Sequence, residues 1–285
     1  MGTLMKGSDV VAAMKEGLLR EVEELAAKGI VPQLAIVRVG ARPDDLAYER
    51  GAMKRMASVG IHCTVVELPE SISQEEFERA FAAVNDDSQI HGILLFRPLP
   101  KQLDEDAVRS TINPTKDIDC MSSVNMAKVF AGDESGFAPC TPEAVMEVLA
   151  HYGVDLKGKR VTLVGRSMVV GKPLAMLLLK QNATVTICHT RTVDLGTACR
   201  NAEVLIAAAG KAKMIPSDFV ADNAVVVDVG INVGPDGTIC GDVDFETVAP
   251  KAAFITPVPG GVGTVTSSVL ANHLVRAARG MNGLN

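Results

Sequence analysis

Apolar residues along this chain fall into two recurring patterns. Short apolar-rich runs at residues 33–39, 62–68 and 92–96 predict strands. Residues 8–28 instead place apolar side chains near helical spacing, which predicts an amphipathic helix capped by Ser8. Further helices are expected at residues 46–59 and from Ser73, whose capping-box partner is Glu76, through Val84. This alternation of strand and helix predicts parallel βαβ units.

The same rhythm continues in the second half of the chain. Strands are expected at residues 160–164, 183–188, 203–206, 224–228 and near 253–255, and helices at 171–180, near 193–200 and from about 266 to 280. Thr141 and Pro142 predict a capped helix over residues 142–151 that links the halves, so we place the domain boundary near residues 140–150. The last helix has no strand after it and is expected to pack back on the first domain.

Composition and charge narrow the classes of function. With 285 residues the chain has room for about two domains, and its 47% hydrophobic residues include no run as long as a membrane span. The N-terminus lacks a signal-peptide pattern, so a cytoplasmic location is expected. The net charge of −6, without a basic stripe, argues against nucleic acid as a partner. The six cysteines show no metal-ligand spacing, so buried thiols and no metal site are expected.

A glycine-containing turn after residues 160–164 is the first candidate site. Gly165 and Gly171 permit a tight turn, and Pro173 opens a helix whose unpaired N–H groups would face an anion such as a nucleotide phosphate. Only the first position of the G-x-G-x-x-G fingerprint matches, because Ser167 and Val170 stand at the other two. Taken alone, the pattern suits a ligand-free strand–turn–helix equally well.

Three further segments fall at the carboxyl ends of predicted strands, where open α/β sheets bind ligands. They are Ala207-Ala-Ala-Gly210, Asp228-Val-Gly-Ile-Asn232 and Thr256-Pro-Val-Pro-Gly-Gly-Val-Gly263. Their position favours a role in binding over a role in packing.

Several motifs taken in order carry a resemblance to a known family. They are Pro139-Cys-Thr-Pro142, Gly165-Arg-Ser-Met-Val-Val-Gly-Lys-Pro173, Asp228-Val-Gly-Ile-Asn232, Gly241-Asp-Val-Asp244 and Thr256-Pro-Val-Pro-Gly-Gly-Val-Gly263. Together they make the chain similar to methylenetetrahydrofolate dehydrogenase/methenyltetrahydrofolate cyclohydrolase over nearly its whole length.

The resemblance implies a two-domain α/β fold with the active-site cleft between the domains. Residues 1–140, with the C-terminal helix of about 266–285, would form the folate-binding catalytic domain. Residues 141–265 would form a Rossmann-like NAD(P)-binding domain. It also implies a homodimer, tetrahydrofolate substrates and hydride transfer to a nicotinamide cofactor, in which positioning supplies much of the catalysis.

Two positions depart from the family pattern for the second, hydrolytic step. The family uses a tyrosine, a lysine four residues later and a glutamine; here these positions are Tyr48, Ala52 and Phe96. Lys54 points about 120° away from Tyr48 on a helix, and Arg55 lies roughly 10 Å further along and cannot act as a base. We therefore expect weak or absent cyclohydrolase activity. In the alternative, Lys54 reaches round a distorted helix, so Tyr48 and Lys54 are the candidate catalytic residues.

The substrate side of the expected site combines one carboxylate with backbone. Asp119, in the loop 112–124 that also holds Lys116 and Asp117, matches the family's acidic pterin ligand, although Cys120 stands where the family usually has glycine. A turn-capping role for Asp119 is the alternative. With Asp119, the expected substrate-binding residues are Tyr48, Pro257, Gly260 and Gly261, where missing side chains would let backbone approach the folate. A surface turn at 260–261 is the alternative.

The cofactor side of the expected site lacks an acidic residue. The residues His189, Thr190 and Arg191 follow the strand after the phosphate turn, where NAD enzymes show Asp or Glu for the ribose hydroxyls. With Arg166 nearby, this favours NADP over NAD, while a solvated Arg191 is the alternative. The expected cofactor-binding residues are Gly165, Arg166, Ser167, Thr190, Arg191 and Ile231.

Three functions remain open from the sequence. The first is a methylenetetrahydrofolate dehydrogenase with little cyclohydrolase activity. The second is the complete bifunctional enzyme, and the third is a binding protein that has lost catalysis. Retention of every cofactor-side motif argues against the third.

Overall fold

The structure, a computed structural model, describes residues 2–284. The chain groups into two compact units: unit 1 is Met1–Ala12 with Pro139–Thr266, and unit 2 is Ala13–Ala138 with Ser267–Asn285. The sequence placed residues 1–12 with the first domain. They belong to unit 1 because strand β1 (Thr3–Leu4) pairs in parallel with β11 (Phe254–Ile255).

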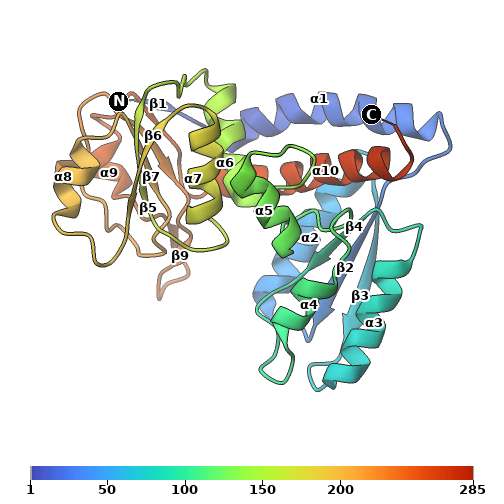
Figure 1. Ribbon diagram of the computed structural model, residues 1–285. Helices are drawn as coiled ribbons and strands as arrows, with labels where there is room; N and C mark the ends of the chain where they lie inside the picture. Colours follow the sequence, from blue (N-terminus) through green and yellow to red (C-terminus); the bar gives the residue numbers. More distant parts are fainter. Residues whose placement is uncertain (1, 285) are drawn as a thin grey trace. The chain divides into compact units, whose positions relative to one another are not determined.

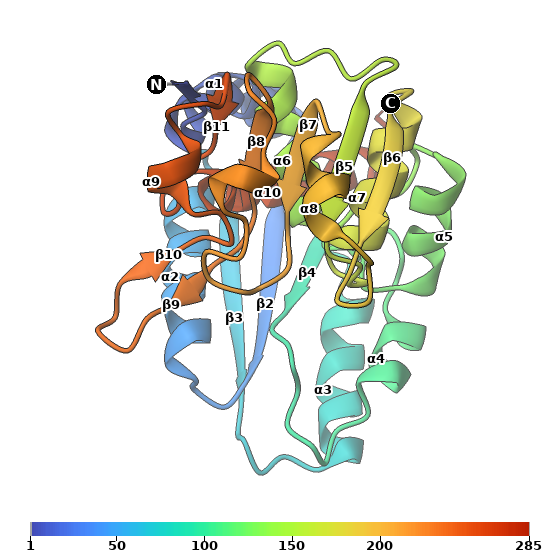
Figure 2. The ribbon, with the colours of Figure 1, turned by 90° about the vertical axis from the view of Figure 1, so that its left-hand side faces the viewer.

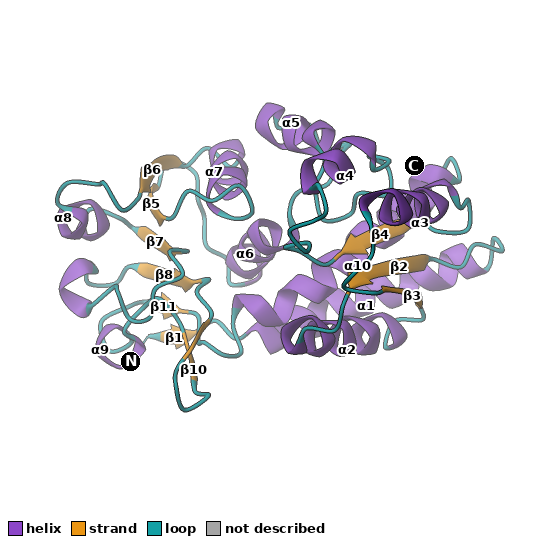
Figure 3. Cartoon of the chain, turned by 90° about the horizontal axis from the view of Figure 1, so that it is seen from below, coloured by secondary structure: helices purple, strands orange, loops and turns teal. Residues whose placement is uncertain are grey.

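Unit 2 is built on a parallel three-stranded sheet. Its order is β3-β2-β4, with β2 at Gln33–Val39, β3 at His62–Leu68 and β4 at Gly92–Leu95. Its helices are α2 (Pro43–Ala57), α3 (Gln74–Asp86), α4 (Glu105–Thr111) and α5 (Ser123–Ala131). Figure 3 shows α3 and α4 on one face of the sheet and α2 on the other.

The core of unit 2 explains why these strands form. All residues of β2 from Leu34 to Val39 are buried, whereas the edge strand β3 is partly exposed. Phe77 and Phe81 of α3 stack at 5.9 Å and pack against one face of the sheet. Ser73 caps α3 by accepting the N–H of Glu76 in the predicted capping box.

Unit 1 contains a parallel six-stranded sheet of order β1-β11-β8-β7-β5-β6 (Figure 2). Its longer strands are β5 (Arg160–Val164), β6 (Thr184–Cys188), β7 (Val204–Ala207) and β8 (Val225–Asp228). Helices α6 (Cys140–His151) and α7 (Gly171–Lys180) cover one face, and α8 (Leu195–Arg200) and α9 (Phe245–Val248) the other (Figure 3). The chain also forms a 3-10 turn at Ser217–Phe219 and a small hairpin of β9 (Asn232–Val233) and β10 (Ile239–Cys240).

In the sheet of unit 1, the order in which the chain adds strands reverses beside β5. The chain passes from β5 to its neighbour β6, and then returns to the other side of β5 to form β7. The carboxyl ends of β5 and β7 therefore flank a topological switch point, where open α/β sheets bind ligands.

Two long helices complete the fold: α1 (Gly7–Ala26) and α10 (Val262–Met281) (Figure 1). In unit 2, His273 Nδ1 of α10 lies 2.8 Å from the carbonyl oxygen of Ile118, so the C-terminal helix packs on this unit. Among the helices described, none is both long and apolar enough to cross a membrane.

The predicted fold class, an α/β fold with a Rossmann-like second domain and parallel sheets, is confirmed. Three local expectations were wrong. Thr141 does not cap α6, because the helix already begins at Cys140 after Pro139. The loop 112–124 ends early, because Ser122 accepts the N–H of Asn125 and starts α5. Helix α10 begins at Val262 rather than near 266.

Candidate functional site

The turn after β5 brings two backbone segments very close together. Gly165 has φ 138°, and a Cβ added there would lie 2.2 Å from the carbonyl oxygen of Ala208 at the end of β7. A Cβ on Gly171 would lie 2.3 Å from the carbonyl oxygen of Gly165. Both positions therefore require glycine, and the turn packs directly against the strand end across the switch point.

Ser167 organises the N-terminus of α7. Its Oγ accepts the N–H of Val170 at 3.0 Å and of Gly171 at 3.4 Å, and its carbonyl oxygen accepts the N–H of Lys172 at 3.0 Å. The N–H groups of Gly171 and Lys172 were expected to be unpaired and to face an anion. They are instead bonded to Ser167, the first to its hydroxyl oxygen and the second to its carbonyl oxygen.

The turn after β6 is held by its own side chains. The N–H of His189 donates to Thr192 Oγ1 at 2.8 Å, and His189 Nδ1 accepts the N–H of Arg191 at 3.1 Å. Asp194, the first carboxylate after the strand, caps α8 by accepting the N–H of Thr197 at 3.2 Å. It is therefore already engaged as a helix cap.

The cationic candidates of unit 1 are exposed. Arg166 and Arg191 lie on the turns after β5 and β6, and Thr190 is exposed beside Arg191. Within residues 2–284 neither guanidinium has a side-chain partner. Two unpaired guanidinium groups on adjacent strand ends suit a phosphate group, which arginine binds through several donors.

A small cavity of about 160 Å³ lies among the strand-end loops that follow β8 and β11. The predicted substrate residues Pro257, Gly260 and Gly261 and the predicted cofactor residue Ile231 all line it. Gly260 has φ 100°, and a Cβ on Gly261 would lie 2.4 Å from the carbonyl oxygen of Pro257. The fold thus brings Ile231 to the segment 257–261, which lies 26 to 30 positions further along the chain.

Asp228 also lines this cavity and is almost fully buried, at 3% exposed. Burial raises the pKa of its carboxyl to about 6, although hydrogen bonds from the backbone N–H groups of Val243, Asp242 and Gly230 oppose that shift. The Asp228 carboxylate is therefore held by the backbone of the neighbouring loops, and its pKa lies well above the ordinary value for aspartate.

Tyr48, Ala52 and Phe96 form an apolar corner in unit 2. Tyr48 on α2 is 41% exposed, and its ring meets Phe96 edge-on with centroids 5.8 Å apart. Ala52, one turn along the helix, is 1% exposed, and Phe96 at the end of β4 is 7% exposed. The two positions at which the family resemblance leads us to expect an amine and an amide are therefore filled by packed hydrocarbon.

Two cations, Lys54 and Arg55, lie near the carboxyl end of α2. The helix runs without interruption from Pro43 to Ala57, and Lys54 lies on its exposed side. Arg55 is half-buried, and its Nε is buried with no hydrogen-bond partner among the described residues. On an uninterrupted helix, the six-residue separation between Tyr48 and Lys54 turns Lys54 about 120° away from the face that carries Tyr48.

The loop before α5 contains two charged side chains with structural roles, Lys116 and Asp117, and one candidate binding residue, Asp119. Lys116 Nζ donates to the carbonyl oxygens of Asn85 and Asp87 at 2.6 and 2.7 Å, and Asp117 accepts two backbone N–H groups that begin the next segment. Both side chains are buried, whereas Asp119 is half-buried. Cys120 has φ 55°, which explains why glycine would suit this position.

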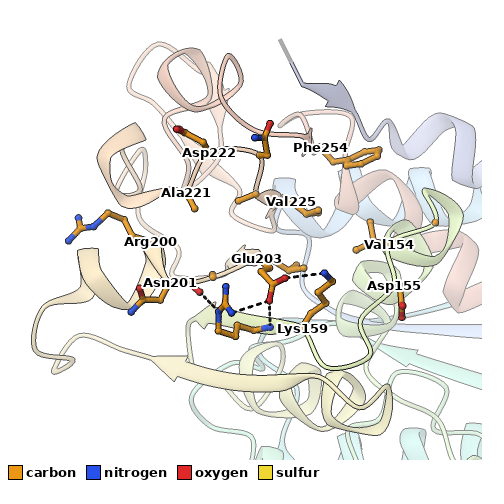
Figure 4. A pocket seen from close by; sticks show the side chains of 16 residues that line it. Val154, Asp155, Lys159, Arg200, Asn201, Glu203, Ala221, Asp222, Val225 and Phe254 are labelled. Atoms are coloured by element: carbon orange, nitrogen blue, oxygen red, sulfur yellow. Dashed lines mark hydrogen bonds and ion pairs between the residues drawn. The ribbon is translucent and has the colours of Figure 1, made fainter.

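A larger hollow of about 720 Å³ opens at the opposite ends of the strands of unit 1 (Figure 4). Its charges are compensated within the unit: Glu203 pairs with Lys159 at 3.0 Å and with Arg160 at 3.6 Å. Lys251 lies 3.2 Å from Asp222. The hollow lies at the amino ends of β5, β7 and β8, away from the edge at which α/β sheets bind ligands, and we assign no ligand to it.

Sequence reasoning missed the roles of Asp242 and Asn232. Both lie within motifs that the sequence singled out, yet their buried contacts join loops that only the fold brings together. No group of three or more metal-binding side chains occurs in the part of the chain that the structure describes.

The geometry defines a class of protein. A parallel sheet with a glycine turn at its switch point, two exposed guanidinium groups and a cavity among the strand-end loops is typical of dinucleotide-binding α/β enzymes.

Comparison with known proteins gives the family. Residues 139–282 match the tetrahydrofolate dehydrogenase/cyclohydrolase NAD(P)-binding domain, and residues 5–119 match the catalytic domain of the same family. The chain belongs to the tetrahydrofolate dehydrogenase/cyclohydrolase family.

Individual relatives are similar to this chain over nearly its whole length. The chain is 56% identical to the bifunctional protein FolD of Clostridioides difficile over 281 residues, which is 99% of this chain and 98% of that protein. The crystal structure of the bifunctional FolD enzyme from Campylobacter jejuni is 40% identical, with a TM-score of 0.96, covering 98% of this chain and 99% of that one. The FolD of Trypanosoma brucei, solved with NADP and an inhibitor, is 35% identical with a TM-score of 0.91 and covers 98% and 97%.

Proposed function

We propose that this chain is a methylenetetrahydrofolate dehydrogenase of one-carbon metabolism that transfers hydride from 5,10-methylenetetrahydrofolate to NADP. Unit 1 binds the nucleotide and unit 2 contributes Tyr48 and Asp119 to folate binding. The dinucleotide supplies the hydride acceptor, and the protein supplies binding and orientation.

The observation that carries this proposal is the glycine turn at the switch point. Gly165 lies within contact distance of Ala208, and the exposed Arg166 and Arg191 follow the two adjacent strands. The cationic turn without a carboxylate for the ribose hydroxyls supports NADP over NAD. A relative that is 35% identical was solved with NADP, which supports the same cofactor.

The second step is hydrolysis of 5,10-methenyltetrahydrofolate to 10-formyltetrahydrofolate. Relatives that are 56% and 40% identical are named as bifunctional, and these names favour a chain with both activities. The expectation of weak or absent cyclohydrolase activity has no support in the comparisons. The bifunctional reading is therefore the stronger of the two.

One observation keeps the dehydrogenase-only function as a second candidate. Ala52 and Phe96 replace the amine and the amide with buried apolar groups, and the ring of Phe96 packs against Tyr48. General acid–base assistance of the kind removed is worth typically ~10²–10⁴-fold in rate.

A pair of assays on the purified protein tests both functions. Formation of NADPH with methylenetetrahydrofolate measures hydride transfer, and loss of methenyltetrahydrofolate measures hydrolysis against a buffer blank. Hydrolysis well above the blank supports the bifunctional enzyme, and hydrolysis at the blank rate supports the second candidate. Nucleotide binding without NADPH formation would contradict both and leave a binding protein.

We also propose that the chain forms a homodimer, as the family resemblance implies. Strand β3 lies at the edge of its sheet and pairs only with β2 among the described strands, so one edge is free for a second copy. Light scattering during size exclusion measures the mass directly, and a mass near 30.0 kDa would contradict the dimer.

A further inference from the structure

Two carboxylates are buried beneath the strand-end loops of unit 1. Asp242 is 0% exposed and Asp228 is 3% exposed. Removing a carboxylate from water costs several kcal/mol unless hydrogen bonds compensate for the lost hydration. The partners of these two side chains therefore show what the burial achieves.

Asp242 joins two loops through four hydrogen bonds. Its Oδ2 accepts the N–H of Ala209 at 2.6 Å and of Gly210 at 2.9 Å. Its Oδ1 accepts the N–H of Lys211 at 2.8 Å and the side-chain amide of Asn232 at 2.9 Å. Residues 209–211 follow β7 and Asn232 follows β8, so one carboxylate ties together the ends of two adjacent strands.

Asp228 holds Asp242 in turn. It accepts the backbone N–H groups of Asp242 and Val243, each at 2.9 Å, and of Gly230 at 2.9 Å. Side chains at two neighbouring glycines would collide with the pair. A Cβ on Gly230 would lie 2.3 Å from Asp242 Cγ, and one on Gly241 only 1.8 Å from Asp228 Oδ2.

This network reaches both the glycine turn after β5 and the cavity that Ile231 lines. Residues 209–211, whose backbone N–H groups donate to Asp242, follow directly after Ala208, against which the Gly165 turn packs. At the other end, Gly230 and Ile231 line the cavity that also contains Pro257. The Asp242 carboxylate thus fixes the position of residues 209–211, beside the Gly165 turn, relative to Gly230 and Ile231 in the wall of the cavity.

We propose that Asp242 is a positioning residue for the dinucleotide: it fixes the loops after β7 and β8 in one arrangement, and this arrangement determines nucleotide affinity. The inference rests on the proposed cofactor binding. Asp242 is fully buried, so it acts through backbone and not by touching the ligand. It therefore affects NADP and NAD by the same factor.

The experiment compares three variants with the unaltered protein. Asp242→Asn replaces one acceptor oxygen by a donor that faces backbone N–H groups. Asn232→Ala removes the hydrogen bond to Asp242 Oδ1 and a longer one, of 3.5 Å, to the carbonyl oxygen of Cys240, and it leaves the bonds from residues 209–211 to Asp242. Asp236→Asn is the matched control, because Asp236 is exposed at the tip of the β9–β10 hairpin. Equilibrium binding gives Kd for NADP and NAD, thermal unfolding confirms folding, and initial rates give kcat at saturating NADP.

We expect Asp242→Asn to raise both Kd values about 10- to 100-fold and by the same factor, as for the loss of charged buried hydrogen bonds. Asn232→Ala should raise both about 3- to 10-fold, while kcat at saturation changes little and Asp236→Asn leaves both Kd values unaltered. Unaltered affinity in folded Asp242→Asn, or a loss for NADP alone, would overturn the inference. If Asp242→Asn does not fold, unaltered affinity in Asn232→Ala overturns it. Absence of nucleotide binding by the unaltered protein would instead refute the proposed function.

Discussion

The strand-end loops of unit 1 and the corner of unit 2 around Tyr48 differ in how they use polarity. In unit 1, two buried carboxylates accept N–H groups from three loops, and glycines make room for them. In unit 2, Ala52 and Phe96 fill the corresponding surroundings of Tyr48 with hydrocarbon.

The difference shows what each region can do chemically. Backbone held by buried charge is rigid, and rigid backbone suits the recognition of a nucleotide that contributes its own chemistry. Of the described side chains beside Tyr48, neither Ala52 nor Phe96 has a group that can activate water. Under the proposed bifunctional activity, hydrolysis at this corner would depend on Tyr48 and on atoms of the substrate. Four variants, one of them a double variant, test this contrast.

The largest effect is expected for Gly165→Ala. The new Cβ would lie 2.2 Å from the carbonyl oxygen of Ala208 at φ 138°, so both strain and overlap oppose it. We expect the free energy of unfolding to fall by about 2–4 kcal/mol and nucleotide binding to be lost. Urea denaturation and NADP titration measure the two effects.

Gly158→Ala is the control for Gly165. Its φ is +73°, but an added Cβ meets nothing within 4 Å, so it carries the strain without the overlap. A loss of stability in Gly165→Ala no greater than in Gly158→Ala would show that the close approach to Ala208 does not matter.

The next largest effect concerns hydrolysis. Ala52→Lys with Phe96→Gln returns an amine and an amide to the corner beside Tyr48. We expect the ratio of hydrolysis to hydride transfer to rise by about 100-fold, whatever its starting value, because general acid–base assistance is restored. The two assays on one preparation give this ratio.

The single variants provide the control for this pair. Two groups that act on one water should couple, so the double variant should exceed the product of the single effects. A ratio that stays unchanged in the folded double variant would mean that the apolar corner does not limit hydrolysis.

Asp119→Ala should weaken folate binding alone. If the carboxylate accepts hydrogen bonds from the pterin ring, its loss costs about 1.5–3 kcal/mol in folate affinity. The Kd for NADP should not change. Separate titrations of the two ligands measure this, with Asp106→Ala as a control because Asp106 makes only an exposed ion pair with Arg109. Normal folate affinity in Asp119→Ala would reduce Asp119 to a turn residue.

The smallest effect is expected for Arg191→Ala. An exposed guanidinium that binds a 2′-phosphate contributes roughly 1–2 kcal/mol in water, so affinity for NADP should fall about 10-fold and that for NAD much less. Initial rates with each cofactor at matched concentrations measure the change. Arg79→Ala, at an exposed ion pair of unit 2, is the control. Equal losses with NADP and NAD would remove Arg191 from the phosphate site.

The sequence by itself determined most of the regular elements. Strands 33–39, 62–68 and 160–164 and the helix 171–180 have the predicted bounds. Apolar runs and glycine or proline at their ends are local signals, and local signals suffice where an element is long enough to show its period. The glycine turn and the order of motifs likewise indicated the family before any contact was known.

The short elements depended on tertiary structure. Strands β1, β9 and β10 have two residues each, too few for any periodic pattern, and they exist because a partner strand supplies their hydrogen bonds. The grouping of residues 1–12 with unit 1 follows from the same pairing.

The functional contacts divide in the same way. The sequence singled out the segments 228–232 and 241–244, but it gave no sign that Asp242 binds residues 209–211 or that Asp228 binds Asp242. These hydrogen bonds join residues 14 to 33 positions apart. The order of the strands in the sheet decides which loops lie side by side, and so which residues can form these hydrogen bonds. That strand order cannot be read from the local sequence pattern.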